Sequence, residues 1–244
     1  GWCRSVCLSV VDRCCSSEEQ VCLLRASDRN LQPVWNRRWL DQAGPPVPVV
    51  VAVPLDGRPK RLLDRRSLAF RVVPEVREEG PGHLLVNGAM DEAYRTSALA
   101  ALVCLRAHWS AIEQRYLSAK SAAEREACRT RAFNRELRLW VFQGDMSAAG
   151  PSAGVATALS LLWGFTGMRF RADTAVTGFM GMSGRVGAVG GVPEKARVAA
   201  AAGLTRLVVP AGSEVKSPAG LEVIQVSTLW DAIEQCREPA PAGR

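Results

Sequence analysis

The second half of the chain alternates between short β-branched apolar runs and longer segments of helical period, and this alternation constrains the fold most. Strands are predicted at residues 137–142, 174–177, 206–209 and 221–226, and helices at residues 153–165, 193–202 and 228–235. A glycine-rich segment that ends at Val189 is expected to form a hairpin. Strands that alternate with helices are typical of layered α/β proteins, so the expected fold class is α+β with α/β layers.

The first half of the chain predicts strands followed by a long helix. Strand-like segments lie at residues 48–53, 68–76 and 84–86, with turn sequences at residues 56–59 and 80–82. Because such short turns join neighbouring strands, we expect an antiparallel meander. From Met90 to Leu105 the apolar residues recur at helical spacing, which predicts a helix with one buried face.

A second helix is predicted from about residue 111 to residue 133, and its sequence is charged nearly all round. Seven basic and four acidic residues lie between Glu113 and Arg138, so this helix should face solvent. A nucleic-acid role for the basic side chains is compatible with this pattern, but a solvated helix face is the commoner explanation. The sequence therefore gives no support to a nucleic-acid partner.

Charge and hydropathy exclude some classes of protein. Lys and Arg number 31 against 24 Asp and Glu, and the net charge of +7 is spread without a block of five like charges. Since no 18 consecutive apolar residues occur, a membrane span is excluded. Residues 1–46 lack a clear period and are interpreted as an N-terminal extension and linker, residues 47–236 as the main domain and residues 237–244 as a tail. The chain starts at Gly1 without an initiator Met, and we expect a fragment of a longer protein.

Eight cysteines raise the question of disulfides or a metal site. Five of them crowd into the first 22 residues, and a chain of this size does not need disulfides to be stable. No C-x2-C pair occurs and the only histidines are His83 and His108, so a structural zinc site in the N-terminal segment is the less favoured alternative. Reduced thiols in a reducing intracellular compartment, with no metal or cofactor bound, are predicted.

The segment Gly150-Pro151-Ser152-Ala153-Gly154 fits the G-x-S-x-G pattern of a nucleophilic serine on a strand-to-helix turn. The pattern taken alone is weak, because Ser152 could equally cap the helix that follows it. A nucleophilic serine needs a base, and both histidines of this chain precede Ser152. In the hydrolases with this pattern an Asp and then a His follow the serine in the chain, so their Ser-His-Asp triad is nearly excluded.

Lysine is the remaining base, since arginine stays protonated in proteins. Only four lysines occur, and Lys195 differs from the others because it follows a Gly-Gly-Val-Pro-Glu segment at the start of a predicted helix, with Pro193 at the first helical position. Burial among alanines and valines and the field of the helix N-terminus would lower the pKa of Lys195. A surface lysine on an amphipathic helix is the plainer alternative. The chemistry indicated is a Ser-Lys dyad.

Together these motifs resemble the proteolytic domain of the Lon protease family. The matching segments are the 150–154 motif, Thr177-Gly178, residues 184–186 and 189–195, residues 199–203 with 208–210, and the upstream residues 87–90 and 95–98. They occur in the family's order over residues 68–235, and Ser152 and Lys195 are 43 positions apart, as in the family. The resemblance implies the Lon proteolytic-domain fold, with mixed sheets packed by helices, behind an N-terminal extension.

The resemblance also implies an activity and its residues. Ser152 would attack the peptide carbonyl, Lys195 would act as general base and acid, and Thr177 would position the lysine by a hydrogen bond. The supporting and oxyanion residues would be Gly150, Pro151, Ala153 and Arg185. The implied protein is an ATP-dependent serine endopeptidase of protein quality control, a hexameric ring that degrades unfolded or damaged polypeptides. ATP and Mg²⁺ would bind only a separate upstream ATPase module, and the implied location is the mitochondrial matrix or a bacterial-type cytoplasm.

The chain departs from the family pattern at several positions. Ala148 and Ala149 replace the usual Lys-Asp pair, and Phe179 replaces the glutamate that usually follows Thr-Gly. The strand at residues 137–142 lacks the family's histidine, residues 111–135 resemble a helical insertion, and no G-x-x-x-x-G-K-[ST] loop occurs. Taken singly, Thr177 could be a strand-end hydroxyl and the glycines at 181–191 a plain hairpin. A catalytically weakened domain kept as a binding or assembly module is therefore the alternative.

Overall fold

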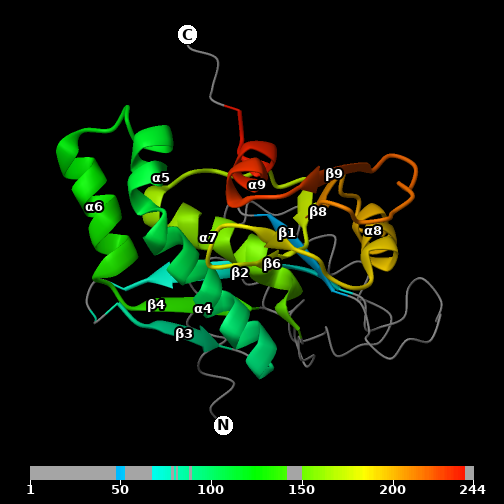
Figure 1. The fold of residues 1–244 in the computed structure, drawn as a ribbon, viewed down its shortest axis with the longest axis horizontal. Helices are drawn as coiled ribbons and strands as arrows, with labels where there is room; N and C mark the ends of the chain where they lie inside the picture. Colours follow the sequence, from blue (N-terminus) through cyan, green and yellow to red (C-terminus); the bar gives the residue numbers. More distant parts are fainter. Residues whose placement is uncertain are drawn as a thin grey trace, which may run out of the picture. The chain divides into compact units, whose positions relative to one another are not determined.

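A seven-stranded mixed sheet organises the protein in the computed structural model, which describes residues 48–52, 68–77, 80, 82–87, 90–141 and 150–239 (Figure 1). The strand order is β3-β4-β2-β1-β5-β8-β9. The strands are β1 (Val49–Ala52), β2 (Leu68–Val76), β3 (Leu84–Asn87), β4 (Leu137–Val141), β5 (Thr174–Val176), β8 (Arg206–Pro210) and β9 (Glu222–Val226). Strands β1, β5, β8 and β9 are parallel neighbours, whereas β2 is antiparallel to both β1 and β4.

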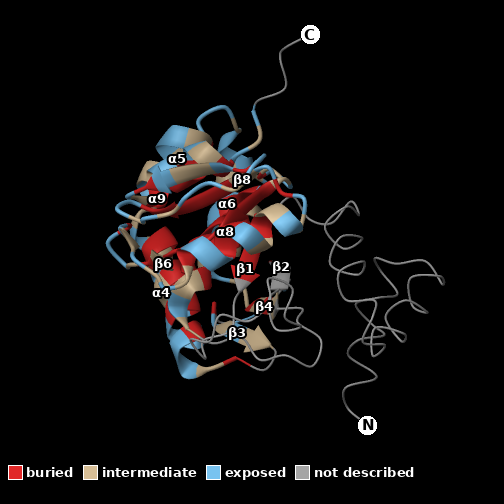
Figure 2. Ribbon diagram, turned by 90° about the vertical axis from the view of Figure 1, so that its right-hand side faces the viewer, coloured by how far each residue is buried: buried red, intermediate tan, exposed pale blue. Residues whose placement is uncertain are grey.

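Six helices pack with this sheet in the described part of the chain, and the predicted layered fold class is confirmed. They are α4 (Glu92–Ala107), α5 (Trp109–Tyr116), α6 (Ala122–Phe133), α7 (Gly154–Thr166), α8 (Val192–Ala201) and α9 (Leu229–Cys236). Helix α7 contacts β2, α4, α6 and α9, and each of its residues from Gly154 to Leu162 is buried. Helix α8 packs against β1 and β8. Figure 2 shows the buried residues concentrated in the strands and on the inner helix faces.

The predicted antiparallel meander is wrong beyond its first pair of strands. Strand β4 lies between β2 and β3, antiparallel to the first and parallel to the second. Gly80, between β2 and β3 in the sequence, lies close to residue 136: a Cβ at Gly80, whose φ is +140°, would lie 2.5 Å from the Glu136 Cβ. Arg77 donates its amide to the Glu136 carbonyl at 2.9 Å, and Leu137 donates to the His83 carbonyl at 2.8 Å. Strands β2 and β3 are therefore consecutive in the sequence but separated in the sheet by β4, which turn chemistry alone does not reveal.

The single helix predicted at 111–133 is also wrong, because the structure has two helices, α5 and α6, interrupted at residues 117–121. The Ser121 hydroxyl accepts the Glu124 amide at 3.3 Å, and the Glu124 carboxylate accepts the Ser121 amide at 2.8 Å. This capping box starts a new helix at Ala122. Solvent exposure is confirmed for half of the α6 residues, but Trp109 and Ile112 of α5 are buried in the core.

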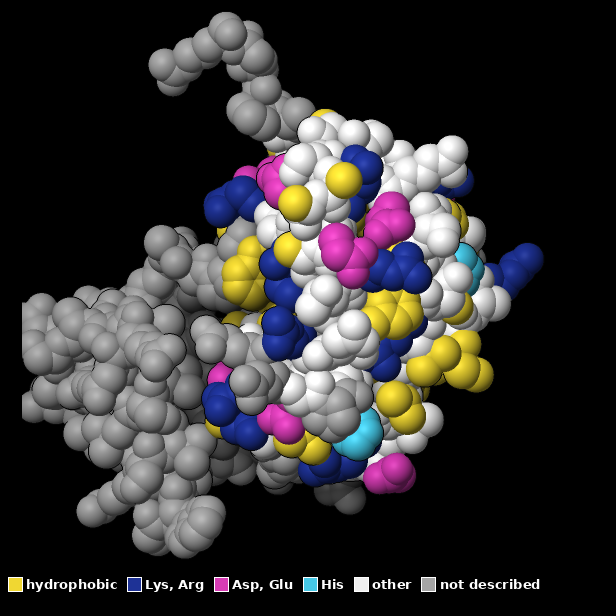
Figure 3. All heavy atoms as spheres, turned by 90° about the vertical axis from the view of Figure 1, so that its left-hand side faces the viewer, with side chains coloured by type: hydrophobic (Ala, Val, Ile, Leu, Met, Phe, Trp, Pro, Cys, Tyr) yellow, Lys and Arg dark blue, Asp and Glu magenta, His cyan; other side chains and the backbone are white. Residues whose placement is uncertain are grey.

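The side of the molecule that carries α6 shows no uniform charge. In Figure 3, basic and acidic side chains are interspersed with polar and apolar atoms over this face. Some of the basic residues bind within the protein, since the Arg131 guanidinium donates to the Phe165 carbonyl at 2.7 Å and Arg138 pairs with Glu136 at 2.9 Å. This arrangement gives a nucleic-acid partner no added support.

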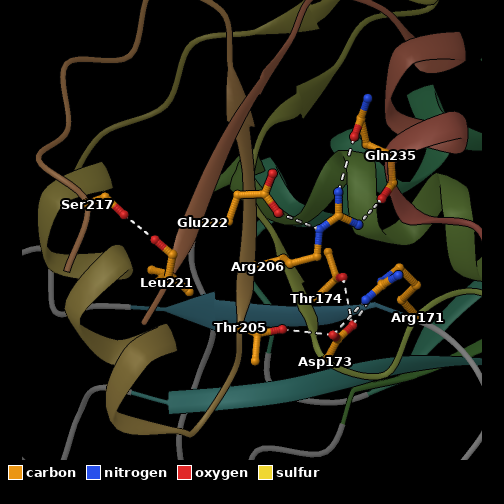
Figure 4. A network of polar contacts seen from close by, with 9 residues as sticks. All are labelled: Arg171, Asp173, Thr174, Thr205, Arg206, Ser217, Leu221, Glu222 and Gln235. Atoms are coloured by element: carbon orange, nitrogen blue, oxygen red, sulfur yellow. Dashed lines mark hydrogen bonds and ion pairs between the residues drawn. The ribbon is translucent and has the colours of Figure 1, made fainter. Parts of the chain in front are cut away.

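A polar network joins the amino ends of β5, β8 and β9 (Figure 4). Asp173 accepts hydrogen bonds from the Arg171 guanidinium at 2.9 Å and from the Thr205 hydroxyl at 2.8 Å. Although burial alone would raise the pKa of Asp173, these hydrogen bonds hold it below its usual value. Arg206 donates to Glu222 at 3.0 Å across β8 and β9. The network fixes the amino ends of these parallel strands, and the Thr177-Gly178 segment described next follows the opposite, carboxyl end of β5.

Three of the eight cysteines lie in described segments, and all three are buried free thiols: Cys104, Cys128 and Cys236. Burial raises the pKa of Cys104 to about 11 and that of Cys236 to about 12, so both stay protonated at neutral pH. The described segments hold no cluster of three potential metal ligands and no helix long and apolar enough to cross a membrane. The predicted extension at 1–46, the turn at 56–59 and residues 148–149 lie outside the described residues.

Candidate active site

Ser152 lies in a single 3₁₀ turn, η1 (Pro151–Ala153), directly before the buried helix α7. The preceding Gly150 has a φ of +84°, a left-handed conformation that glycine adopts without strain. The residue that caps α7 is Ala153, and no side chain makes a capping hydrogen bond at either η1 or α7. The helix-cap alternative for Ser152 is therefore wrong, and Ser152 is half-buried.

The Thr177-Gly178 segment, which follows the carboxyl end of β5, anchors the Ser152 backbone. The Gly178 amide donates to the Ser152 carbonyl at 2.8 Å, and the Thr177 hydroxyl donates to the same carbonyl at 3.3 Å. The Val155 amide returns a hydrogen bond to the Gly178 carbonyl at 3.1 Å. A Cβ at Gly178 would lie 2.8 Å from a Val155 methyl group, so only glycine allows this close approach. These hydrogen bonds thus connect the η1 turn that carries Ser152 to the end of β5.

The side chain of Lys195, on α8, also contacts Thr177. Its side chain is buried, with 4% exposed, and its Nζ donates to the Thr177 Oγ1 at 3.0 Å. Burial lowers the pKa of Lys195 from 10.5 to about 8, because a buried ammonium loses its hydration. The surface-lysine alternative is therefore wrong. Helix α8 begins at Val192, so Pro193 occupies the second helical position rather than the predicted first.

Thr177 connects the two predicted catalytic residues. Its hydroxyl accepts from the Lys195 ammonium and donates to the Ser152 carbonyl, and its side chain is only 1% exposed. Among the described residues, the Lys195 ammonium binds Thr177 and makes no direct hydrogen bond to the Ser152 hydroxyl. Catalytic hydrogen bonds are often long or unformed in apo sites, so a Ser-Lys dyad stays a prediction at this point.

The other predicted supporting residues differ in how they relate to Ser152. Gly150, Pro151 and Ala153 flank it in the same turn, whereas Arg185 is exposed in a hairpin and pairs through its backbone with Thr228. No contact joins the Arg185 side chain to Ser152 or Lys195 in the described segments. The oxyanion roles of all these residues stay predictions.

Sequence reasoning missed two side chains of α4 that contact the Ser152 turn. The Asp91 carboxylate accepts the Gly150 amide at 2.9 Å, and the Ser97 hydroxyl donates to the Pro151 carbonyl at 3.0 Å. The N-cap preference for aspartate before a helix could have identified Asp91 as a cap. Nothing local in the sequence indicates its second contact, 59 positions along the chain.

The predicted hairpin is confirmed, with β6 (Phe179–Met180) antiparallel to β7 (Val186–Gly187). Phe179, which replaces the family's glutamate, is half-buried, and a Cβ at Gly187 would lie 2.9 Å from its ring. The ring therefore packs over the Gly187 backbone, and the residue after Thr177-Gly178 brings no carboxylate to the lysine.

Gly154 provides a test of how tightly this site is packed. An added Cβ would lie 2.6 Å from the Ser97 Oγ and 2.7 Å from the Met180 amide nitrogen. We expect Gly154→Ala to lower the free energy of unfolding by about 1–3 kcal/mol, although alanine is the better helix former. Urea unfolding measures the change.

Gly190→Ala is the matched control, since a Cβ at Gly190 meets nothing within 4 Å and its φ is not in the left-handed region. We expect the stability of this variant to stay within about 0.5 kcal/mol of wild type. A Gly154→Ala variant as stable as Gly190→Ala would contradict the close packing of α4, α7 and β6 around the turn.

A serine just before a buried helix and a buried lysine, both hydrogen-bonded to Thr177, fit the arrangement of a serine-type hydrolase. Comparison with known families gives the particular class. The chain belongs to the Lon protease (S16) C-terminal proteolytic domain family, whose model matches residues 70–218. The predicted resemblance is thereby confirmed, and the family consists of peptidases of the serine type.

Individual relatives agree with this assignment. Lon protease of Phenylobacterium zucineum (strain HLK1) is 31% identical over 175 residues, which cover 68% of this chain and 20% of the relative. Lon protease 4 of Sorangium cellulosum (strain So ce56) is 34% identical over 174 residues, with the same coverage of 68% and 20%. The peroxisomal Lon protease homolog 2 of Oryza sativa subsp. indica is 30% identical over 166 residues, covering 65% and 18%. The chain spans about a fifth of the length of the curated relatives it matches.

Proposed function

We propose that this chain is the serine endopeptidase module of an ATP-dependent Lon-type protease, with Ser152 as nucleophile and Lys195 as general base. The observation that carries the proposal is the buried Lys195 ammonium, whose pKa is lowered to about 8 and whose only described partner, Thr177, also holds the Ser152 backbone. A lysine with this pKa is partly neutral near pH 7.5, so it can accept a proton.

The proposed reaction proceeds in two halves. The neutral Lys195 amine takes the proton of the Ser152 hydroxyl while Oγ attacks the peptide carbonyl carbon, and the resulting ammonium then protonates the leaving amine. Water hydrolyses the acyl-enzyme with Lys195 again as base, which restores Ser152. Because the η1 turn that carries Ser152 directly precedes α7, the negative charge on the carbonyl oxygen develops near the positive end of that helix dipole. No cofactor in this chain takes part.

The pH dependence of cleavage tests this proposal. We expect kcat/KM for an unstructured fluorogenic peptide to rise about tenfold per pH unit below pH 8 and to level off above it, because only the neutral lysine is active. Initial rates from pH 6 to 10 at constant ionic strength measure the profile. A rate that is flat over this range would remove Lys195 from the role of general base.

The alternative of a non-catalytic binding or assembly module has one structural observation in its favour. The Phe179 ring occupies the position of the family's glutamate and brings no charge near Lys195. The same assay separates the two functions, since a folded chain that cleaves no peptide at any pH would support the binding module. Lys195 and Thr177 retain their hydrogen bond despite Phe179, which favours the enzyme.

The partners and location of the whole protein form part of the proposal. By the family, we propose a homohexameric ring with an upstream ATPase module that binds ATP and Mg²⁺ and delivers unfolded or damaged polypeptides. Cyclic closure is a usual outcome of head-to-tail contacts between identical chains. Three buried free thiols agree with a reducing intracellular compartment, and we propose the mitochondrial matrix or a bacterial-type cytoplasm.

A further inference from the structure

Side chains at the start of α4, distant in the sequence, make hydrogen bonds to the backbone of the turn that carries Ser152. Asp91 is the N-cap of α4, and its Oδ1 accepts the Tyr94 amide at 2.8 Å. Its Oδ2 accepts the Gly150 amide at 2.9 Å. One carboxylate thus binds two backbone amides that are far apart in the sequence, one on each of its oxygens.

A second contact from α4 fixes the next peptide group. The buried Ser97 hydroxyl donates to the Pro151 carbonyl at 3.0 Å. That carbonyl and the Ser152 amide belong to one peptide unit, and since the described segments contain no cis peptide bond they point in opposite directions. Ser97 therefore sets the direction of the Ser152 N–H.

Gly150 is the part of the turn that most needs an anchor. Its φ of +84° and ψ of 165° lie in a region open almost only to glycine, whose backbone rotates more freely than that of any other residue. A charged acceptor makes a stronger hydrogen bond to an amide than a neutral acceptor does. The Asp91 carboxylate is suited to hold this one residue in place.

We propose that Asp91 is a positioning residue for the Ser152 nucleophile, acting through the Gly150 amide, with Ser97 fixing the adjoining peptide. The inference rests on the proposed function of Ser152. Asp91 touches no reacting atom in this scheme. It holds the turn so that the Ser152 hydroxyl stays within reach of the lysine held by Thr177.

The variant Asp91→Ser separates this role from helix capping. Serine is also a preferred N-cap, so it can keep the Tyr94 contact, but its single short hydroxyl leaves the Gly150 amide unbound. We expect kcat to fall on the order of 10- to 100-fold with KM little changed, because a small misplacement of the nucleophile slows chemistry rather than binding. The rate should keep its rise toward pH 8, since Lys195 is untouched. Asp91→Asn, with one acceptor oxygen, is the second variant and should also lose kcat.

Ser121→Ala is the matched control, because it removes the cap of α6 and leaves the Ser152 turn intact. We expect its kcat to equal that of wild type. A wild-type kcat in folded Asp91→Ser would overturn the inference, as would an equal loss in Ser121→Ala.

Hydrogen exchange gives a readout that does not depend on activity. We expect the Gly150 amide, followed by NMR, to exchange at least tenfold faster in Asp91→Ser than in wild type, while Tyr94 stays protected. Equal exchange at Gly150 in both proteins would overturn the contact itself. If Gly150 exchange responds but wild type cleaves nothing, the proposed function fails while the contact between α4 and the turn stands.

Discussion

Replacing Ser152 with alanine is expected to abolish peptide cleavage and to leave the fold intact. The backbone of Ser152, not its hydroxyl, makes the contacts that hold the turn, since its carbonyl accepts from Gly178 at 2.8 Å and from Thr177 at 3.3 Å. Alanine keeps these contacts, so the free energy of unfolding should change by less than about 1 kcal/mol. Loss of the nucleophile should lower kcat on the order of 10⁴-fold or more. Fluorogenic peptide cleavage and urea unfolding measure the two quantities.

A fluorophosphonate label identifies the nucleophile independently of substrate choice. We expect mass spectrometry to find the label on Ser152 in wild type and no label in Ser152→Ala. Ser183→Ala is a matched control, because Ser183 is an exposed serine of the β6–β7 hairpin, and this variant should label as wild type does. Persistent cleavage of an unfolded casein-like substrate by Ser152→Ala would overturn the assignment.

Ser152 and Lys195 could be predicted from the sequence because each lies in a short segment whose residues indicate its role. The Gly-Pro-Ser-Ala-Gly turn before an apolar helix indicated the place of Ser152, and the alanines and valines around Lys195 indicated burial, as found. The structure adds the physical cause of the lowered pKa of Lys195, which is loss of hydration in the interior.

Contacts between segments far apart in the sequence could not be predicted from the same patterns. Strand β4 enters between β2 and β3 from some 50 residues further along the chain, and no turn signal specifies this insertion. The contact between Asp91 and Gly150 has the same character, since it exists only once α4 packs beside the serine turn. The break between α5 and α6 could have been predicted, because Ser121 and Glu124 have the spacing of a capping box. The charged residues continue without interruption across the break, and this pattern favoured a single helix.

Replacing Lys195 with methionine is expected to abolish cleavage and, at neutral pH, to stabilise the fold. Methionine matches the length of the lysine side chain without its charge, so the buried site no longer holds an ammonium. The lowering of the Lys195 pKa from 10.5 to about 8 means that burying its ammonium costs the fold about 3 kcal/mol at most, a cost that methionine removes. The variant also loses the hydrogen bond to Thr177, which offsets about 1 kcal/mol of this stabilisation. We expect the free energy of unfolding at pH 7 to rise by about 1–2 kcal/mol. Urea unfolding and peptide cleavage measure the two effects.

The difference in stability between wild type and Lys195→Met should depend on pH in one direction. Well below pH 8 the lysine is protonated in both the folded and the unfolded chain, so wild type bears the full cost of the buried charge. Between pH 8 and 10.5 the unfolded chain binds more protons than the folded chain, so wild-type stability rises with pH and the advantage of methionine shrinks. Other titrating groups are common to both proteins and cancel in the difference. Lys195→Arg, which keeps a charge that cannot act as a base, should be inactive without gaining stability. A stability difference that stays constant from pH 7 to 10.5 would mean that folding does not lower the pKa of Lys195. Cleavage that survives in Lys195→Met would mean that Lys195 is not the base.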